Sequence, residues 1–388
     1  MPTSYINVSD LKVAEDLLLF VNNELLKDTD VNQEKFWIGF SQAAHDLAIK
    51  NKKLLKKRED LKQKIDEWHI KNRKNQIKVE EYKKFLKEIG YLVDEGKDFE
   101  IETNNVDAEI AKIAGPQLVV PIMNARYTLN AANARWVSLY DSLYGTNIIE
   151  SEEGSSERYD PLRGQEVIKY VREFFDKHIP IKGTSWKNIA GLKIVNKDLI
   201  ISKDDYEYYL KDKDKFVGHR GDANKPSAII LKNNNLHFEI IINPKAFSAA
   251  HDIAGISDVI IESAVSTICD NEDSVAAVDS SDKIVCYKNW LGLMKGNLKI
   301  QFEKNGKNLE RKLNPDRSYI SKNGKGLKLH GRSLLLVRNV GHLMTNPSII
   351  LKDGTEIPEG IMDAFFTSTA ALHDLKLKKN SRKGSIYI

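Results

Sequence analysis

Three short runs of mostly apolar residues, each leading into polar or charged residues, limit what this 388-residue chain can fold into. The runs cover residues 118–123, 266–269 and 333–337. Nearly unbroken runs of this length are typical of strands buried on both faces of a parallel α/β sheet. Functional side chains collect at the carboxyl ends of such strands, so we expect a site where these three runs end.

Length and composition describe an ordinary globular protein. The chain is 41% hydrophobic and 29% charged, with a net charge of +4, which excludes the disordered, collagen-like and disulfide-rich classes. Single cores stop growing at about 250–300 residues, so we expect two or three domains. The two cysteines, Cys269 and Cys286, are too few for a disulfide scaffold, and no apolar run approaches the ~20 residues of a membrane helix. These features favour a cytoplasmic protein.

The first ninety residues predict a helical unit. Apolar residues recur at helical spacing over residues 10–27, 34–72 and 79–89, and Ser9 is a suitable N-cap for the first helix. The second helix carries a basic face, formed by Lys52, Lys53, Lys56, Lys57, Arg58, Lys62 and Lys64. Such a face indicates either a nucleic-acid or acidic partner, or a solvated helix surface. The acidic residues interleaved with it favour the solvated surface.

The remainder of the chain predicts further helices and two stretches rich in hairpins. We expect helices over residues 129–144, 165–175, 259–265 and 361–375, and the start of another buried strand at 384–388. Alternating runs joined by Asn-containing turns predict hairpins over 192–201 and 228–242, and Asn-Gly pairs predict more within 296–332. We interpret both hairpin-rich stretches as one α/β accessory domain that is inserted twice into the main fold.

The strand ends carry the functional prediction, because the sequence has no Walker, dinucleotide-binding, hydrolase or zinc-protease motif. The guanidinium of Arg338 suits a carboxylate or a developing oxyanion, or it simply pairs with a neighbouring acid. The nearby acids Asp270, Glu272 and Asp273 can bind a metal, influence one another's protonation, or partner Arg338. Arg126 with Tyr127, and Arg311 with Lys312, suit the phosphates of a large cofactor.

Several blocks at these positions resemble malate synthase, isoform G. They are GPQLVVPIMNARYTLNAANARWVSLYDSLYGTN (115–147), DNEDSVAAVD (270–279), NWLGLMKGNL (289–298), HGRSLLLVRNVGHLMTNP (330–347) and EIPEGIMDA (356–364). The resemblance implies an α/β fold: a TIM barrel, incomplete here, with an N-terminal α-helical clasp, an inserted α/β domain and a C-terminal plug. The clasp then covers residues 1–90, the barrel 115–134, 263–295 and 333–388, and the insertion 135–262 and 296–332.

The resemblance also implies a reaction, the Claisen condensation of acetyl-CoA with glyoxylate followed by hydrolysis to malate and CoA, with Mg²⁺ required. Arg338 matches the arginine that contacts glyoxylate and stabilises the enolate of acetyl-CoA. The family's acetyl-CoA contacts map onto Val119, Arg126, Tyr127, Ser274 and Arg311. Asp270 and Glu272 match acidic residues near the reaction centre.

One departure from the family limits these expectations. Isoform G is close to twice this length, and the resemblance places its two carboxylate metal ligands and its aspartate base beyond the equivalent of residue 388. We therefore expect no family metal ligand within the chain and little or no malate synthase activity from it alone. The expected partners are acetyl-CoA and glyoxylate, without nucleic acid or a membrane. We expect a monomer, or a chain paired with a separate C-terminal polypeptide.

Two alternatives belong to other functional classes. The first is a non-catalytic subunit of a split enzyme, whose active site a separate chain completes. The second is a helical nucleic-acid-binding module built on Lys52 to Lys64. That module predicts steeply salt-dependent binding to a duplex, because phosphate contacts release counterions.

Overall fold

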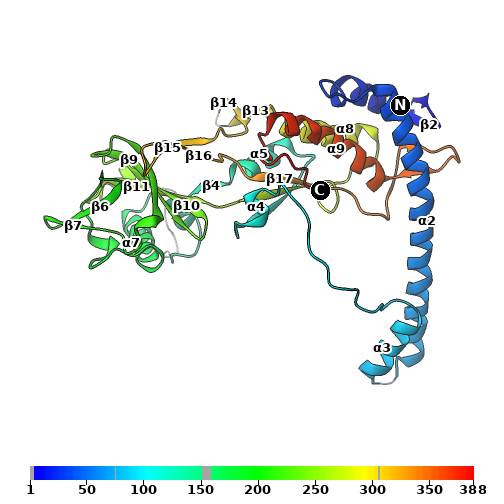
Figure 1. Cartoon of the computed structure of the whole chain (residues 1–388), viewed down its shortest axis with the longest axis horizontal. Coiled ribbons are helices and arrows are strands. Elements are labelled where there is room, and N and C mark those ends of the chain that lie inside the picture. The colour runs from blue at the N-terminus through cyan, green and yellow to red at the C-terminus, as the bar shows by residue number, and fades with distance from the viewer. Residues whose placement is uncertain (1–3, 75, 151–158, 305) are drawn as a thin grey trace.

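The computed structural model describes residues 4–74, 76–150, 159–304 and 306–388, and these form three parts (Figure 1). A central part holds a small parallel sheet and its helices. A second part, rich in antiparallel strands, lies at one end, and the N-terminal part with the long helix α2 (Gln33–Asn72) lies at the other. Buried apolar side chains form two clusters: one joins the N-terminal and central parts, and the other fills the strand-rich part.

The central sheet has three parallel strands in the order β17 (Leu334–Arg338), β12 (Ser266–Asp270) and β3 (Gln117–Pro121). These strands coincide with the three apolar runs, so the predicted parallel strands are confirmed. Asp270 is in register with Pro121 on one side and with Arg338 on the other. The carboxyl ends of all three strands therefore meet at one edge of the sheet.

One face of this sheet is covered by helices, and the other is open. Val120, Cys269 and Val337 on the covered face share an apolar cluster with α5 (Ala125–Asn133), α8 (Ser280–Lys295) and α9 (Glu359–Leu377). On the open face, Val119 of β3 is 58% exposed, so the expected burial of this run on both faces is wrong. The reason is that only the face that carries Val120 packs against helices, so a side chain on the opposite face, such as Val119, remains exposed.

The N-terminus begins with a hairpin rather than with the predicted helix. β1 (Tyr5–Val8) pairs with β2 (Leu11–Ala14), and Ser9 lies in the turn with a φ of 53°, so it is not a helix cap. The helix is limited to α1 (Glu15–Phe20) and the π-helical turn Val21–Leu25 that continues it. β2 also pairs with β18 (Thr345–Ile350), which pairs with β19 (Glu356–Pro358).

The two longer N-terminal helices are as predicted. α2 begins after Asn32, whose side chain accepts a hydrogen bond from the amide of Lys35. The fully buried residues of α2 lie in its first turns, and the rest of the helix extends away from the body to meet α3 (Val79–Glu88) (Figure 1). There the ring centroids of Trp68 and Tyr82 lie 4.5 Å apart. Residues 89–107 return without a helix or strand to α4 (Ala108–Ala111).

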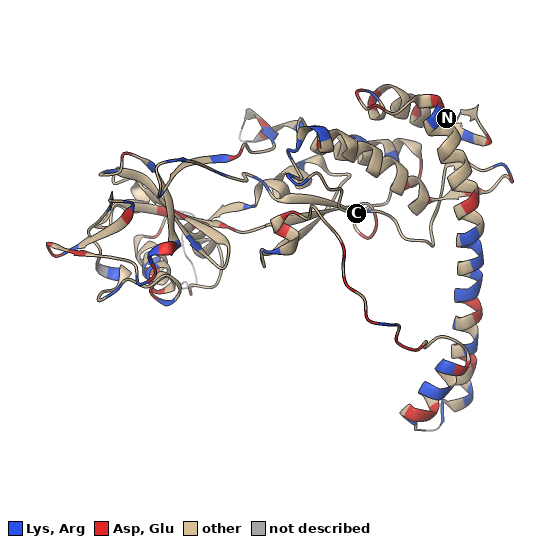
Figure 2. Ribbon diagram, in the orientation of Figure 1, with Lys and Arg blue, Asp and Glu red and all other residues tan. Residues whose placement is uncertain are grey.

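The surroundings of the basic face of α2 agree with the solvated helix surface that the sequence favours. The basic face of α2 is interleaved with acidic residues (Figure 2), and Lys56 pairs with Asp60 at 3.6 Å, as Lys62 does with Asp66 at 3.9 Å. Exposed pairs of this kind support a solvated helix and contribute little else. Within the described residues, no helix combines the length and the apolar character that crossing a bilayer requires.

The strand-rich part is built on two antiparallel sheets. The seven-stranded sheet has the order β16 (Gly326–Leu329), β15 (Arg317–Ser321), β8 (Phe216–Gly221), β9 (Pro226–Asn233), β10 (Leu236–Ile242), β11 (Ile256–Glu262) and β4 (Trp136–Ser138). The three-stranded sheet contains β5 (Gly191–Val195), β6 (Asp198–Lys203) and β7 (Tyr206–Tyr208). Helices α6 (Leu139–Tyr144) and α7 (Pro161–His178) contribute to the same apolar cluster. The predicted hairpins β5–β6 and β9–β10 are confirmed, with Asn196 and Asn234 at positive φ in their turns.

Residues 296–332 divide between two places. β13 (Lys299–Lys304) and β14 (Lys307–Lys312) form a separate hairpin next to α5, whereas β15 and β16 join the seven-stranded sheet through β8. Of the two predicted Asn-Gly turns, Asn305 lies outside the described residues, and Gly324 has a φ of 77° between β15 and β16. The proposed division of the chain into domains stays a prediction.

Two of the predicted helices are wrong. Residues 256–262 form β11, antiparallel to β10, in place of a helix over 259–265, because the β-branched Val259, Ile260 and Ile261 suit a strand. The helix expected over 129–144 is divided into α5 and α6 by β4, which pairs with β11. Residues 384–388 are not an assigned strand, although the amide of Val337 donates to the carbonyl of Tyr387 at 3.1 Å, beside β17.

Candidate active site

Arg338 and Asp270 form the centre of the candidate site, at the carboxyl edge of the central sheet. Nε and Nη2 of Arg338 donate to the two carboxylate oxygens of Asp270, at 2.8 and 2.9 Å. This bidentate geometry is possible because the two parallel strands end in register. The side chain of Asp270 is fully buried, whereas that of Arg338 is 41% exposed. A fixed carboxylate therefore holds a guanidinium that remains open on its other side.

The loop that follows β12 also holds Asp270. The carboxylate accepts hydrogen bonds from the amides of Glu272 (2.9 Å) and Ser274 (3.1 Å) and from the Ser274 hydroxyl (2.7 Å). Burial alone would raise the pKa of Asp270, but the hydrogen bonds from Arg338 and from this loop outweigh burial and hold the pKa well below its ordinary value. The hydrogen bond to Asp270 also raises the pKa of Arg338. Both side chains are therefore charged at neutral pH.

A cavity adjoins this ion pair. It has a volume of about 630 Å³ and is lined by residues 271–273, 275–278, 340–346 and 359. Arg338 itself does not line the cavity, but both loops that follow Asp270 and Arg338 do. Asn271 is 3% exposed, and its Oδ1 has no hydrogen-bond partner within the described part of the chain. Asn271 thus adds a buried, unpartnered acceptor to the wall of the cavity.

The remaining acids of this loop are more exposed. Asp273 Oδ2 lies 3.0 Å from Nη2 of Arg338, and Glu272 Oε2 lies 4.0 Å from Nε. Nη1 of Arg338 takes part in no hydrogen bond or ion pair among the residues that the structure describes. Arg338 can therefore stabilise negative charge on a ligand without leaving Asp270.

A second group of sequence-predicted residues gathers on α5 and the β13–β14 hairpin. The guanidinium carbons of Arg126 and Arg311 lie 4.5 and 5.6 Å from the centre of the Phe302 ring. Arg311 also donates to the Asn130 side chain, and Tyr127 is 56% exposed. Neither arginine pairs with a carboxylate in the described residues, so both cations are available to phosphates.

Helix α8 fixes the loop that leads into α5. The Asn289 side chain donates to the carbonyls of Ile122 at 2.8 Å and Met123 at 3.2 Å. The amide of Ile122 donates to the carbonyl of Asp270 at 3.1 Å. Through these bonds the structure connects the segment that carries Arg126 to the strand end that carries Asp270. Ser274 belongs to the Asp270 loop, and Val119 to the open face of β3.

Comparison with known sequences matches the chain to one family. The family description "Malate synthase, N-terminal domain" matches residues 16–75, and "Malate synthase G, alpha-beta insertion domain" matches residues 159–233. Malate synthase G of Corynebacterium glutamicum is 49% identical over 391 residues, covering 100% of this chain and 53% of that protein. Malate synthase G of Corynebacterium efficiens is 48% identical (100% and 52%), and that of Halalkalibacterium halodurans 47% (99% and 54%). The chain belongs to the malate synthase G family.

The chain spans about half the length of the curated malate synthase G relatives it matches. The insertion-domain match covers helix α7 and strands β5 to β9 of the strand-rich part. The N-terminal match covers α1 from Asp16 onward and all of α2, and the bounds of the expected clasp stay a prediction. The resemblance read from the sequence blocks is therefore confirmed, and the roles of the individual site residues remain proposals.

The residues described here do not by themselves fit a Mg²⁺ ion. Mg²⁺ is held in proteins by one or two carboxylates together with waters and substrate oxygens. Within the described ranges, no group of three or more His, Cys, Asp or Glu side chains is placed to hold a metal. The oxygens of Asp270 are used by Arg338 and Ser274, and Asp273 and Glu272 lie beside the same guanidinium. No catalytic step is therefore assigned to a metal on these residues.

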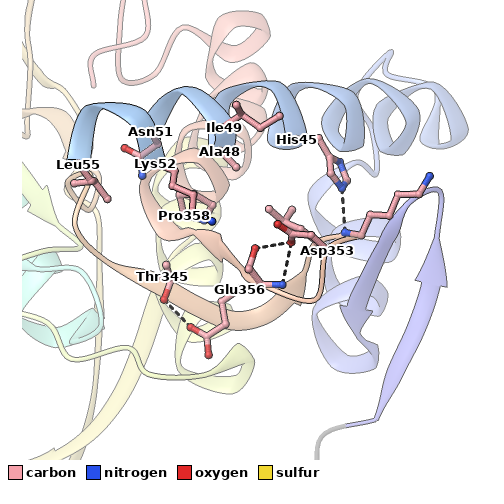
Figure 3. A pocket seen from close by; sticks show the side chains of 13 residues that line it. His45, Ala48, Ile49, Asn51, Lys52, Leu55, Thr345, Asp353, Glu356 and Pro358 are labelled. Carbon is pink, nitrogen blue, oxygen red and sulfur yellow. Dashed lines mark hydrogen bonds between the residues drawn. The ribbon is translucent and has the colours of Figure 1, made fainter. Parts of the chain in front are cut away.

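A second cavity, of about 480 Å³, lies between α2 and the hairpin β18–β19 (Figure 3). His45 and Lys52 line it from the helix, and Thr345 and Glu356 from the hairpin. The amide of Lys352 donates to Nε2 of His45 at 3.1 Å, and the Thr345 hydroxyl donates to Glu356 at 2.6 Å. His45 thus attaches α2 to the turn between β18 and β19, and none of the predicted site residues lines this cavity.

Sequence reasoning missed Asn271 and the residues that support the Arg338 loop. Asn271 lies within the DNEDS block, which resembles the family, but the sequence does not indicate that its side chain is buried. The supporting residues Lys283 and Asp363 lie 80 positions apart and are described below. No sequence spacing connects them.

Acidification is expected to weaken the ion pair of Asp270. Because the pKa of this group is lower in the folded chain, its contribution to stability is complete above the ordinary Asp pKa and is lost as the pH falls below about 4. The stability difference between wild type and Asp270→Asn should shrink by up to about 1.4 kcal/mol per pH unit in that range. Urea unfolding between pH 3 and 7 measures this. A difference that does not change with pH would contradict it.

Proposed function

We propose that this chain supplies part of the active site of a malate synthase, which condenses acetyl-CoA with glyoxylate and hydrolyses the product to malate and CoA. The observation that carries the proposal is the half-exposed Arg338, fixed by the buried Asp270 beside a cavity at the carboxyl edge of a parallel sheet. The three strands are proposed as part of a TIM barrel, with residues 1–90 as its clasp. Membership of the malate synthase G family supports this reading.

Arg338 is the proposed catalytic residue of this chain. Removal of a proton from the methyl group of acetyl-CoA leaves an enolate, whose carbon then attacks the aldehyde carbon of glyoxylate. Negative charge on the thioester oxygen is stabilised by a cation that is already in place, and such stabilisation contributes several kcal/mol. Because Asp270 holds Nε and Nη2, the guanidinium needs no reorganisation as that charge develops. The group that removes the proton is not assigned to a residue of this chain.

The other site residues are proposed to bind acetyl-CoA. Arg126 and Arg311 both contact the Phe302 ring, and we propose that their two cations bind the phosphates of CoA. Tyr127 follows Arg126 on α5 and Val119 lies on β3, and both side chains are exposed. Ser274, whose hydroxyl donates to Asp270, is proposed to contact acetyl-CoA from the Asp270 loop. Glu272 is proposed to position the loop beyond Arg338. Mg²⁺ remains part of the proposal only as a requirement of the family.

The experiment is an assay of CoA release from acetyl-CoA and glyoxylate with Mg²⁺. It compares residues 1–388 alone with a polypeptide that also carries the segment matching the remainder of the curated relatives. We expect turnover from the longer polypeptide and little or none from residues 1–388. Absence of turnover in both would contradict the proposed function. Equal turnover in both would contradict the expectation that the base and metal ligands lie outside residues 1–388.

A further inference from the structure

Helices α8 and α9 lie side by side (Figure 1), and a buried charge cluster joins them. Nζ of Lys283, a fully buried lysine, lies 2.8 Å from Oδ1 of Asp363 and 2.5 Å from Oε1 of Glu359. The Tyr287 hydroxyl donates to the same Asp363 oxygen at 2.5 Å. Burial opposes the charge on Lys283, but Asp363 and Glu359 outweigh it and raise the pKa of this lysine. The lysine is therefore a buried cation.

This cluster reaches the loop that follows Arg338. Oδ2 of Asp363 accepts a hydrogen bond from the amide of Val340 at 3.0 Å. On one side of Val340, the Asn339 side chain donates to the Thr367 hydroxyl at 3.1 Å, and on the other the amide of Gly341 donates to Glu272 at 3.1 Å. Three successive residues after Arg338 are thus attached to α9 or to the Asp270 loop.

The close approach of α9 to this loop depends on a glycine. A Cβ added at Gly360 would lie 2.5 Å from the carbonyl oxygen of Val340 and 3.3 Å from that of Gly341. Both contacts are to backbone atoms, which cannot turn aside as the end of a side chain can. The loop and the first turn of α9 therefore fit together only while position 360 has no side chain.

A charge cluster of this kind is not explained by stability alone. Placing three ionisable groups out of water is unfavourable unless the geometry is good, and apolar side chains of similar volume often stabilise a fold as well. Glu359 illustrates this, because burial raises its pKa even beside Lys283. One carboxylate oxygen of Asp363 is engaged by Lys283 and Tyr287, and the other by the loop amide, so the cluster fixes a backbone position next to the site.

We infer that Lys283 and Asp363 are positioning residues: Lys283 orients Asp363, which fixes the amide of Val340 and thereby the segment that carries Arg338. The consequence for catalysis rests on the proposed function. Neither residue lines the cavity or reaches a substrate, so their effect passes through the loop. The precise placement of a reacting group is worth a large factor in rate, since a shift of about 1 Å can lower turnover about 100-fold.

The test uses two variants that displace the loop in different ways and one matched control. Asp363→Asn keeps the shape of the side chain but cannot accept from Val340 while it also accepts from Lys283 and Tyr287. Gly360→Ala pushes the same loop without changing any charge. The control, Asp252→Asn, disrupts an equally buried pair with Arg172 in the strand-rich part, where the side chains are 3% and 4% exposed.

The first readout is hydrogen exchange of the peptide spanning residues 338–344, which requires no activity. We expect exchange about tenfold faster in Asp363→Asn and Gly360→Ala, and no change in Asp252→Asn. Unchanged exchange in both loop variants would overturn the inference, as would equal acceleration in the control. If Asp363→Asn does not fold, Gly360→Ala and the control still decide the outcome.

The second readout is steady-state kinetics in the polypeptide that carries malate synthase activity. We expect kcat to fall about 10- to 100-fold in both loop variants, with the KM for acetyl-CoA within about twofold, because Asn289 holds the Arg126 segment independently. An equal rise in KM, or an unchanged kcat, would contradict a positioning role. Absence of any activity in the wild type would instead contradict the proposed function, and hydrogen exchange would still test the loop.

Discussion

In the longer polypeptide that is proposed to carry malate synthase activity, replacement of Arg338 with alanine is expected to lower turnover by about 100- to 1,000-fold, the usual effect of removing one preorganised donor from a developing oxyanion. Lysine should not restore it, because an ammonium cannot make the bidentate contact that holds the guanidinium against Asp270. The measurement is CoA release at saturating acetyl-CoA and glyoxylate, with the midpoint of thermal unfolding recorded for each variant.

Arg220→Ala is the matched control for this experiment. Arg220 is 44% exposed and pairs with the fully buried Glu239 at 2.6 Å, so its environment is close to that of Arg338 beside Asp270. It lies on β8 of the strand-rich part, away from the carboxyl edge of the central sheet. Both variants leave a buried carboxylate without one partner, but only Arg338→Ala should lose turnover. Turnover within a few-fold of wild type in Arg338→Ala would contradict the proposed catalytic role.

The central strands and the Arg338–Asp270 pair were predictable because their signals are local. An apolar run that ends in a charged residue indicates both a buried strand and the position of its carboxyl end. Parallel pairing in register then brings Asp270 to Arg338, although 68 residues separate them.

Other features depended on tertiary context that the sequence pattern does not contain. Periodicity alone does not separate a buried helix from a buried strand in a short apolar run such as 259–265, and its β-branched residues together with pairing to β10 and β4 decide for the strand. The exposure of Val119 depends on whether another element packs on the open face of the central sheet. Lys283 resembles any surface lysine in the sequence, and only the packing of α8 against α9 makes it a buried cation.

Replacement of Arg135 with methionine is expected to destabilise the junction between the central and strand-rich parts by about 3–5 kcal/mol. Arg135 lies where the chain enters β4, and its guanidinium lies 2.8 Å from Glu109 and 2.6 Å from Glu262, the last residue of β11. These three side chains are 3%, 5% and 2% exposed. Without the arginine, the two buried carboxylates lose their shared cation, and His237 alone still contacts Glu262, at 2.7 Å. Urea unfolding at pH 7 measures the loss.

Arg382→Met serves as the control, because Arg382 is 37% exposed and its pair with Asp316 should contribute no more than about 1 kcal/mol. The double variant Arg135→Met/Glu262→Gln should recover part of the lost stability, since it removes one of the two unpaired charges.

Arg135→Met alone should also regain stability as the pH falls toward 5, because the uncompensated carboxylates then take up protons on folding. In the wild type, burial tends to raise the pKa of Glu262, but its bonds to His237 and Arg135 outweigh burial and lower it. The wild type should therefore show no such gain on acidification, and the same gain in both proteins would mean that Arg135 does not neutralise these carboxylates.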